Sequence, residues 1–298
     1  LSPDGMGRIT LDLDDLPPDK WASDAVAFRG AALGDDQLAR GFYEGGTYEA
    51  WVATVGRLVP YPRALLALYT SFVPPLLQIL RLPNFSADWA NRTSTGKTSV
   101  LRTAASVWGN PDEKSPDTMI HPWNMTRVWL ERAAGVLSGL PIFMDDTRQA
   151  RKPEQIAESI YLIGNGQGRG RGNIKGLAPS RNFHTVLLST GEAPATSSSE
   201  KGGSVMRCME IRGLPFGEES EEMGRLADGL YLSLLVNFGH AGPRFVQYLL
   251  QHRDRWPTYA AAHKVAMGQL ISLSTDSAAG RLASYAAAIE VAAKMAHD

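Results

Sequence analysis

The sequence is poor in cysteine: Cys208 stands alone among 298 residues, which excludes an internal disulfide framework. The chain begins at Leu1 and shows no basic segment followed by an apolar one. We therefore expect no secretory signal, and the chain looks like a piece excised from a longer protein. A lone thiol suits a reducing compartment, so we predict a cytoplasmic protein.

Long hydrophobic runs are also scarce. The most apolar stretch, residues 64–80, is shorter than the roughly 20 residues of a membrane-spanning helix, and Pro74 and Pro75 interrupt it. We predict two buried helices hinged at these prolines, and no membrane contact. The net charge is only −1, so any nucleic-acid contact needs a local basic patch. The six histidines show no metal-binding spacing.

The bulk composition is that of a globular protein, with 44% hydrophobic and 20% charged residues. Predicted strands alternate with predicted helices from residue 83 onward, which favours an α/β fold with a largely parallel sheet. We divide the chain into an acidic, loop-rich start with a helical region (1–82), a core (83–214) and a helical C-terminal lid region (215–298). Strands are expected over 84–90, 140–146, 184–189 and 205–211. Helices are expected over 47–58, 98–108, 125–137 (capped by Asn124), 154–163, 226–238 and 243–252.

The stretch NRTSTGKTSVL, residues 91–101, is close to the phosphate-loop pattern of Gly, four residues and Gly-Lys-Ser/Thr. Asn91 stands in place of the first glycine, and we expect it to be tolerated because asparagine visits left-handed backbone conformations. The tripeptide alone often occurs by chance, but here a predicted strand precedes it and a predicted helix follows. Backbone N–H groups of such a loop point at an anion, which makes ATP the expected ligand. The predicted ATP-binding residues are Asn91, Ser94, Thr95, Gly96, Lys97, Thr98 and Ser99.

Within this loop, Lys97 would reach the β- and γ-phosphates, and the Thr98 hydroxyl would hold Mg²⁺. A second ligand for Mg²⁺ is expected from IFMDD, residues 142–146, a short apolar strand that ends in two carboxylates. Asp145 would hold the metal, and Asp146 would orient the attacking water. Asp146 is one methylene shorter than the glutamate usual at this position, which puts its reach in question. A strand end with solvated carboxylates is the plainer alternative.

A third element is TVLLSTGE, residues 185–192, in which a polar residue at the strand end would sense the γ-phosphate. Ser189 and Thr190 are both candidates, and we prefer Thr190; an ordinary turn after a core strand is the alternative. Ring-shaped ATPases also need arginines at the nucleotide, from a neighbouring subunit or from their own lid. Arg207 is the preferred finger from a neighbour, and Arg281 is a further candidate for contact with the nucleotide.

The fourth element is GNGQGRGRGNIKG, residues 164–176, which is rich in glycine and has Ile174 as its one aliphatic residue. No core can form from such a segment, so we predict a flexible loop. Arg169, Arg171 and Lys175 would grip the phosphates of a nucleic acid. A solvated connector without function is the alternative.

Taken in order, these segments resemble a domain-of-unknown-function family of phages, prophages and mobile elements, described as helicase-like ATPases and their inactivated derivatives. The resemblance rests on STGKTSVLRTAASVWGNP, IFMDD, YLIGNGQGRGRG, LLSTGE and MRCMEIRG, and covers roughly residues 48–295. It implies a RecA/AAA-like P-loop core, a ring that is preferably hexameric, and work on single-stranded DNA in a central channel during replication. It carries over Lys97, Thr98, Asp145 and the strand end at Ser189 and Thr190.

Two functions from different classes remain open on these residues. The leading one is an ATP-driven DNA helicase or translocase, with Lys97, Asp145, Asp146, Thr190 and Arg207 as its catalytic groups. The other is a nucleotide-binding loader or scaffold that hydrolyses little, because Asn91 and Asp146 depart from the usual hydrolytic machinery. A small-molecule kinase would need an acceptor pocket, and the glycine- and arginine-rich loop argues against it.

Overall fold

The computed structural model describes residues 33–92, 95–169, 171–173, 176–178, 182–197, 206–218, 220–273 and 279–297. Its centre is a sheet of five parallel strands in the order β2-β3-β6-β1-β7. The strands are β1 (Phe85–Ala90), β2 (Ile120–Pro122), β3 (Ile142–Asp145), β6 (Val186–Gly191) and β7 (Cys208–Arg212). The expectation of a mixed α/β fold with a parallel sheet is confirmed.

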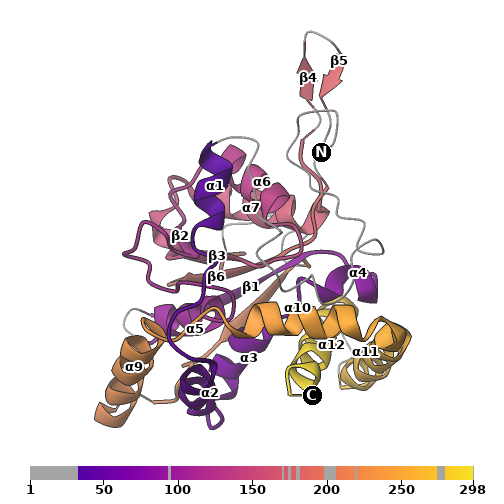
Figure 1. Cartoon of the computed structure of the whole chain (residues 1–298). Coiled ribbons are helices and arrows are strands. Elements are labelled where there is room, and N and C mark those ends of the chain that lie inside the picture. Colours follow the sequence, from indigo (N-terminus) through magenta and orange to yellow (C-terminus); the bar gives the residue numbers. More distant parts are fainter. Residues whose placement is uncertain are drawn as a thin grey trace.

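Helices cover both faces of this sheet (Figure 1). One face carries α1 (Leu33–Ala39), α6 (Arg127–Val136) and α7 (Pro153–Asn165). The helices of the other face are α2 (Tyr48–Gly56), α3 (Pro62–Thr70), α4 (Leu76–Leu80), α5 (Lys97–Ala105), α9 (Glu221–Leu234), α10 (Ala241–Gln251), α11 (Trp256–Ile271) and α12 (Ala279–Met295). Two short 3₁₀ turns, η2 (Thr147–Gln149) and η3 (Arg253–Arg255), follow β3 and α10.

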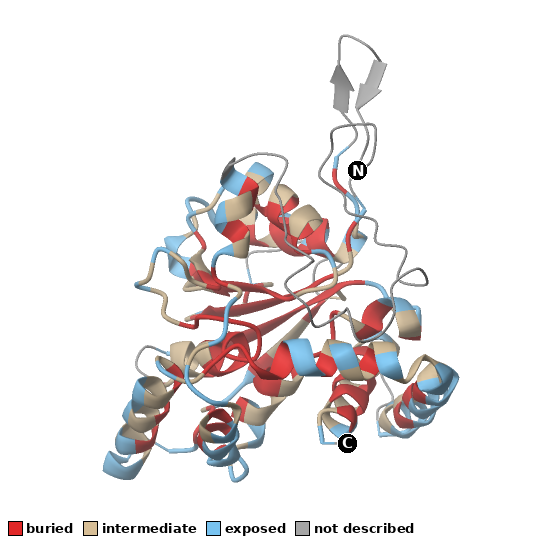
Figure 2. Cartoon of the chain, viewed as in Figure 1, coloured by how far each residue is buried: buried red, intermediate tan, exposed pale blue. Residues whose placement is uncertain are grey.

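Strand β1 shows why two helical layers are needed. Phe85, Ala87 and Trp89 pack into the core on the α5 side, while Ser86 and Asp88, which face the other layer, are equally buried. The central strands β1 and β6 are buried along their whole length, and Figure 2 shows the exposed residues on the outer sides of the helices. The alternation in the sequence therefore marks two buried faces, as is usual in a parallel sheet.

Several predicted elements are confirmed, with shifts at their ends. The apolar stretch 64–80 forms α3 and α4, and Pro74 and Pro75 lie between them. Pro153 opens α7, where its missing N–H costs nothing. The cap expected at Asn124 was wrong: Thr126 caps α6, because its hydroxyl oxygen accepts a hydrogen bond from the N–H of Trp129 at 3.2 Å.

Two segments that were expected to be irregular contain a helix or a strand. In the acidic start, residues 33–39 form α1, which is tied to α6 by an ion pair between the buried Asp35 and Arg132. In the segment 164–176, α7 continues to Asn165, and β4 (Arg171–Asn173) pairs antiparallel with β5 (Gly176–Ala178). The lack of regular structure predicted there was wrong for residues 171–173, and the flexibility of the segment stays a prediction. A hairpin needs only paired backbone groups, so the lack of apolar side chains does not prevent it.

The three predicted regions share a core. Leu68 from the first region, Phe85 from the second and Tyr285 from the third belong to one hydrophobic cluster, and the rings of Phe85 and Tyr285 stack at 4.3 Å. The boundaries at residues 82 and 214 stay predictions, but packing joins the regions across them. None of the helices in the described part of the chain combines the length and apolar character needed to cross a bilayer.

Asp88 is a carboxylate in the middle of this sheet, with no exposed surface. Burial raises the pKa of its carboxyl from 3.8 to about 7, although the N–H of Ala195 donates to it at 2.9 Å and opposes the rise. Glu210, its partner on β7, adds to the rise. Between about pH 4 and pH 7 the carboxyl of the unfolded chain loses its proton, while that of the folded chain keeps it. The free energy of unfolding therefore falls as pH rises through this range, and the loss levels off above pH 7.

We expect Asp88→Asn to remove this pH-dependent loss of stability. Asparagine keeps an oxygen for the N–H of Ala195 but cannot ionise, so the variant should gain a few kcal/mol in unfolding free energy relative to the unaltered protein between about pH 4 and pH 8. Urea unfolding across that range measures the difference. The matched control is Asp228→Asn, at an exposed position of α9. An equal offset at every pH would contradict the role given to Asp88.

Candidate nucleotide-binding site

The predicted phosphate loop begins at the carboxyl end of β1. The N–H of Asn91 donates to the carbonyl of Gly191 at 3.0 Å, so the chain stays paired with β6 one residue beyond the strand. Asn91 does not adopt the positive φ expected of it, because this pairing keeps it extended. Its side-chain oxygen instead accepts a hydrogen bond from the N–H of Arg92 at 2.8 Å. Ser94 lies outside the described residues.

Gly96 closes the loop and precedes α5. It has φ 84° and ψ 13°, a left-handed conformation that glycine adopts without strain. A Cβ at this position would lie 2.6 Å from two ring carbons of Phe216, which packs over the loop. Both the backbone and its neighbour therefore require glycine here. Nothing in the sequence pattern pointed to Phe216, because it approaches from the segment between β7 and α9.

Lys97, the first residue of α5, bends its side chain back over the loop. Its ammonium donates to the carbonyl oxygen of Asn91 at 2.6 Å and also to that of Arg92. Burial lowers the pKa of Lys97, and the carboxylates of Glu192, Asp146 and Asp145 oppose this in that order. The side chain is thus a cation surrounded by carboxylates at the end of the loop.

Two hydroxyl groups converge on Asp145 at the end of β3. Thr98 Oγ1 donates to Asp145 Oδ2 at 3.3 Å, and Thr190 Oγ1 donates to Asp145 Oδ1. Burial raises the pKa of Asp145, as does the neighbouring Asp146, while the Thr190 hydrogen bond lowers it. Of the two candidates at the end of β6, Thr190 is the one that contacts Asp145. Ser189 instead accepts a hydrogen bond from Trp123 Nε1 at 3.1 Å.

Asp146 lies beside Asp145 but is engaged in its own turn. Its φ of 58° is a left-handed conformation, and its Oδ1 caps η2 by accepting from the N–H of Arg148 at 3.2 Å. The Arg148 guanidinium lies 3.4 Å from the same oxygen and 3.0 Å from Oε1 of Glu192. Arg148 and Glu192 were not predicted as site residues. Glu192 stood in the quoted TVLLSTGE segment, whereas nothing marked Arg148.

These groups line one cavity of about 380 Å³ at the carboxyl edge of the sheet. Its walls come from the loop, from the ends of β3 and β6, and from α9. The lining residues are Thr95, Gly96, Lys97, Thr98, Ser99, Asp145, Asp146, Arg148, Gln149, Thr190, Glu192 and Ala227. The Thr98 hydroxyl and the Asp145 carboxylate are adjacent oxygen donors at a position open to the cavity, the kind of donors that Mg²⁺ takes in proteins.

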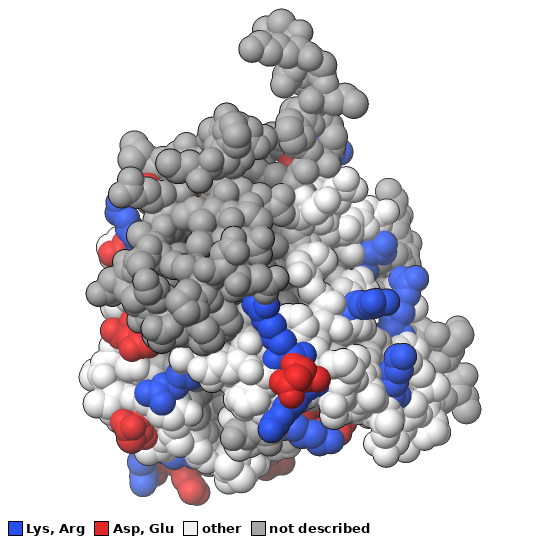
Figure 3. Space-filling view, turned by 45° about the vertical axis from the view of Figure 1, so that its right-hand side comes forward, with Lys and Arg blue, Asp and Glu red and all other residues white. Residues whose placement is uncertain are grey.

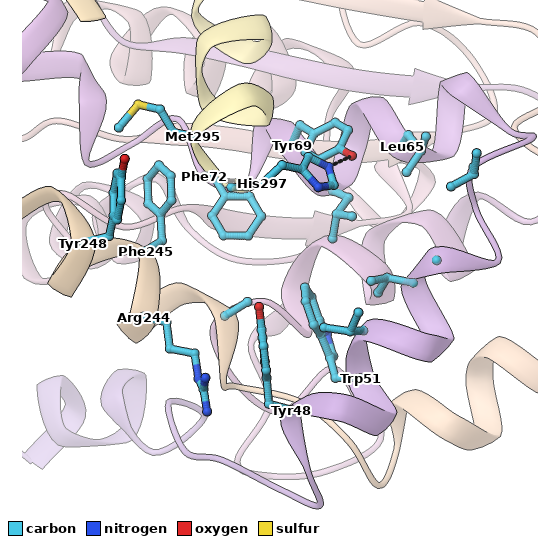
Figure 4. A pocket seen from close by; sticks show the side chains of 17 residues that line it. Tyr48, Trp51, Leu65, Tyr69, Phe72, Arg244, Phe245, Tyr248, Met295 and His297 are labelled. Carbon is cyan, nitrogen blue, oxygen red and sulfur yellow. Dashed lines mark hydrogen bonds between the residues drawn. The ribbon is translucent and has the colours of Figure 1, made fainter.

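A second cavity, of about 300 Å³, lies among α2, α3, α10 and α12 and is built differently (Figure 4). Aromatic and aliphatic side chains form most of its wall, and no carboxylate is among its lining residues. The Tyr69 hydroxyl and His297 Nε2 are hydrogen-bonded at 2.7 Å, and the Arg244 guanidinium lies 4.0 Å from the centre of the Tyr48 ring. Neither a carboxylate nor a serine or threonine hydroxyl is among its lining residues, unlike those of the first cavity.

The two predicted nucleotide-contacting arginines lie at the other edge of the sheet. The N–H of Ser86 donates to the carbonyl of Arg207 at 2.8 Å, so Arg207 stands beside the start of β1, roughly 15–20 Å along the strand from the loop. Its guanidinium covers the Tyr161 ring at 4.7 Å. Arg281 lies in the first turn of α12. Burial raises the pKa of Tyr285, and the charges of Arg281 and Arg207 both lower it. Neither arginine reaches its own chain's cavity, so contact with a neighbour's nucleotide stays a prediction for both.

Two of the three residues predicted to bind DNA, Arg169 and Arg171, lie on or beside the β4–β5 hairpin. The hairpin projects from the body of the molecule, away from the sheet (Figure 1). Arg169 is exposed just before it, and Arg171 opens β4. Lys175 lies outside the described residues.

Comparison with known proteins places this site within a family. Residues 23–182, more than half of the chain, match the family described as "Domain of unknown function (DUF927)". The chain belongs to this family. The DUF927 match includes the loop and both aspartates, and ends before Thr190 and Glu192. No curated protein matches the sequence.

A solved structure titled "SCCmec type IV Cch - active helicase" is similar in fold to this DUF927 protein, with a TM-score of 0.67 at 20% sequence identity. The similarity covers 85% of this chain and 47% of the other, so this chain spans about half the length of that protein. The mixed α/β architecture around a parallel sheet is therefore shared with a helicase structure.

Substitution of Gly96 tests whether the loop depends on its left-handed residue. Gly96→Ala should lower the unfolding free energy by about 1–2 kcal/mol from the backbone alone, and further because Phe216 must move. Gly224→Ala in α9 is the matched control: no atom lies within 4 Å of its Cβ, and alanine favours helix. Thermal unfolding measures both variants, and equal midpoints would contradict this account of the loop.

Proposed function

We propose that this protein is an ATP-driven motor that acts on DNA, of the helicase or translocase type. The observation that carries the proposal is the meeting of Lys97, Thr98, Asp145 and Thr190 at one cavity. These residues come from three separate parts of the sequence, and each has the chemistry that binding and hydrolysis of a nucleoside triphosphate require. A structural match to a helicase supports the same class.

In this proposal the loop and the start of α5 bind the phosphates of ATP through backbone N–H groups, and Lys97 contacts the β- and γ-phosphates. Thr98 and Asp145 would hold Mg²⁺, which would neutralise part of the phosphate charge when bound. Thr190 fixes Asp145 and also accepts a hydrogen bond from the N–H of Asp146 at 3.2 Å. Asp146 was predicted to orient the attacking water, and both Asp146 and Glu192 line the cavity.

The sheet order supports a RecA/AAA-like P-loop core. One strand, β6, separates the strand of the loop from the strand of the carboxylates, so a polar group at its end lies between the two. We further propose a ring, hexameric by preference, in which Arg207 and Arg281 of one subunit face the cavity of the next. Their distance from their own cavity supports a role between subunits.

The DNA contact in this proposal is the β4–β5 hairpin. Basic side chains are scattered over the described part of the face in Figure 3, with acidic ones among them, so a local projection is a better candidate than that surface. The hairpin follows α7 and precedes β6, so it joins the DNA contact to the strand that ends at the nucleotide. Work in replication of a phage or mobile element is the expected setting.

A second candidate is a nucleotide-binding loader or scaffold with little hydrolysis. It is favoured by Asp146, whose Oδ1 is bound by Arg148 and by its own turn. ATP turnover with and without single-stranded DNA separates the two candidates. A motor should hydrolyse ATP faster on DNA, whereas a scaffold should bind ATP with little turnover in either condition. A protein that binds no ATP at all would contradict both.

Lys97→Ala should weaken ATP binding roughly 10- to 100-fold, because it removes a charged donor worth about 1.5–3 kcal/mol. Titration with a fluorescent ATP analogue measures the affinity. Lys264→Ala, on the exposed side of α11, is the matched control and should bind as the unaltered protein does. Unchanged affinity in Lys97→Ala would show that the phosphates bind elsewhere.

Neutralising Arg169, Arg171 and Lys175 together should weaken binding to single-stranded DNA and flatten its log–log salt dependence by roughly 2, because up to three phosphate contacts are lost. ATP affinity should not change, since none of the three belongs to the phosphate loop at residues 91–99. The matched control neutralises Arg225, Lys264 and Lys294, which are exposed on α9, α11 and α12. If only the control weakened DNA binding, the contact would lie on the helical face.

A further inference from the structure

Glu192 lies where the loop and β6 meet. Gly191, the last residue of β6, accepts the hydrogen bond from Asn91, so Glu192 follows beside the first residue of the loop. Its side chain lines the cavity and is 29% exposed. Lys97, the cation expected at the γ-phosphate, lines the same cavity.

Hydrogen bonds to two strands of the sheet hold the segment that carries Glu192. The N–H of Ala195 donates to the buried Asp88 on β1 at 2.9 Å, and the Thr196 hydroxyl donates to Glu210 on β7. Before the segment, Gly191 passes so close to Thr147 that a Cβ would lie 2.1 Å from its hydroxyl. Contacts to two strands and a close approach to η2 fix the path of the chain on both sides of Glu192.

Asp146 differs from Glu192 in reach and in its partners. Its Oδ1 accepts from the backbone and is paired with the side chain of Arg148, and its carboxylate is one methylene closer to the backbone. Glu192 has the longer side chain and contacts the outer end of Arg148 at 3.0 Å. Both carboxylates line the cavity and both pair with Arg148, but Glu192 has the longer reach from its own backbone, whereas Asp146 also caps η2.

We propose that Glu192 orients the water that attacks the γ-phosphate; this rests on the proposed function as an ATPase. The oxygen of the water bonds to the γ-phosphorus, and the bond to the bridging oxygen breaks with its electron pair left on ADP. The proton of the water passes to the Glu192 carboxylate, which releases it to solvent. Arg148 positions Glu192 through the ion pair at Oε1, and Asp146 caps η2 and holds Arg148 from the other side.

The test compares Glu192→Gln with Asp146→Asn. Asparagine at 146 keeps the oxygen that caps η2 but loses the charge that pairs with Arg148, so that variant should lower kcat clearly less than Glu192→Gln does. Glu192→Gln should lower kcat by about 100-fold or more, the range of a lost general base, with ATP affinity within about 3-fold. The kcat of Glu192→Asp should fall between those of the two variants. The control is Glu290→Gln, at a half-buried position of α12 outside the cavity lining.

A second readout does not depend on turnover. ADP with aluminium fluoride mimics the transferred phosphoryl group, and a residue that acts in the transition state contributes to binding it. The unaltered protein and Asp146→Asn should bind ADP–aluminium fluoride more tightly than ADP, and Glu192→Gln should lose at least about 10-fold of that preference.

Each outcome decides between the claims. If the unaltered protein neither hydrolyses ATP nor prefers ADP–aluminium fluoride, the proposed function fails, and the role of Glu192 with it. If the unaltered protein shows both properties and Glu192→Gln keeps both, the function stands and the role of Glu192 is wrong. The same holds if Asp146→Asn is the one variant that loses them. Loss of ATP binding itself in Glu192→Gln would also overturn the proposal, because Glu192 would then build the site rather than act in the reaction.

Discussion

Strand β6 lies between β1 and β3, and this order brings the groups of the candidate site together. Ser189 on β6 is level with Asp88 on one neighbour and with Met144 on the other. Because the three strands are parallel, their carboxyl ends open at the same edge of the sheet. The loop, the aspartates and the Thr190 hydroxyl therefore meet without distortion of any strand. The same arrangement leaves their side chains close enough for direct hydrogen bonds.

Burial of carboxylates at this sheet is offset by donors from neighbouring segments. Asp145 is bound by the hydroxyls of Thr98 and Thr190, and Asp88 by a backbone N–H. Burial raises the pKa of both carboxyls, which is the expected cost of removing a charge from water. Asp145 lines the cavity, whereas Asp88 is fully buried and binds the N–H of Ala195 in the segment that follows Glu192. One carboxylate is thus placed for a ligand, and the other holds the chain that carries Glu192.

The two edges of the sheet carry different cations. Lys97 and Arg148 lie at the carboxyl edge, where carboxylates surround them. Arg207 and Arg281 lie at the opposite edge, near Tyr161 and Tyr285. In the proposed ring, this division would let one subunit supply the phosphate loop and its neighbour supply the arginines. A site of that kind is complete only when two subunits meet, which couples hydrolysis to assembly.

Local patterns in the sequence determined most of the secondary structure and the centre of the candidate site. Glycine at 96, the residues after it and the strand that ends at Asp145 follow from spacing along the chain, because a strand, a tight turn and a helix start depend on nearby residues. The choice of Thr190 needed the sheet, since only the register of β6 shows which of two adjacent hydroxyls reaches Asp145. Phe216, Arg148 and Glu192 became site residues through tertiary packing. Their positions depend on segments distant in sequence, as does the helix tied by Asp35 to Arg132. Contacts between remote segments leave no period or spacing in a single sequence. The hairpin was missed for another reason: neighbouring residues pair through their backbone groups, which need no apolar pattern.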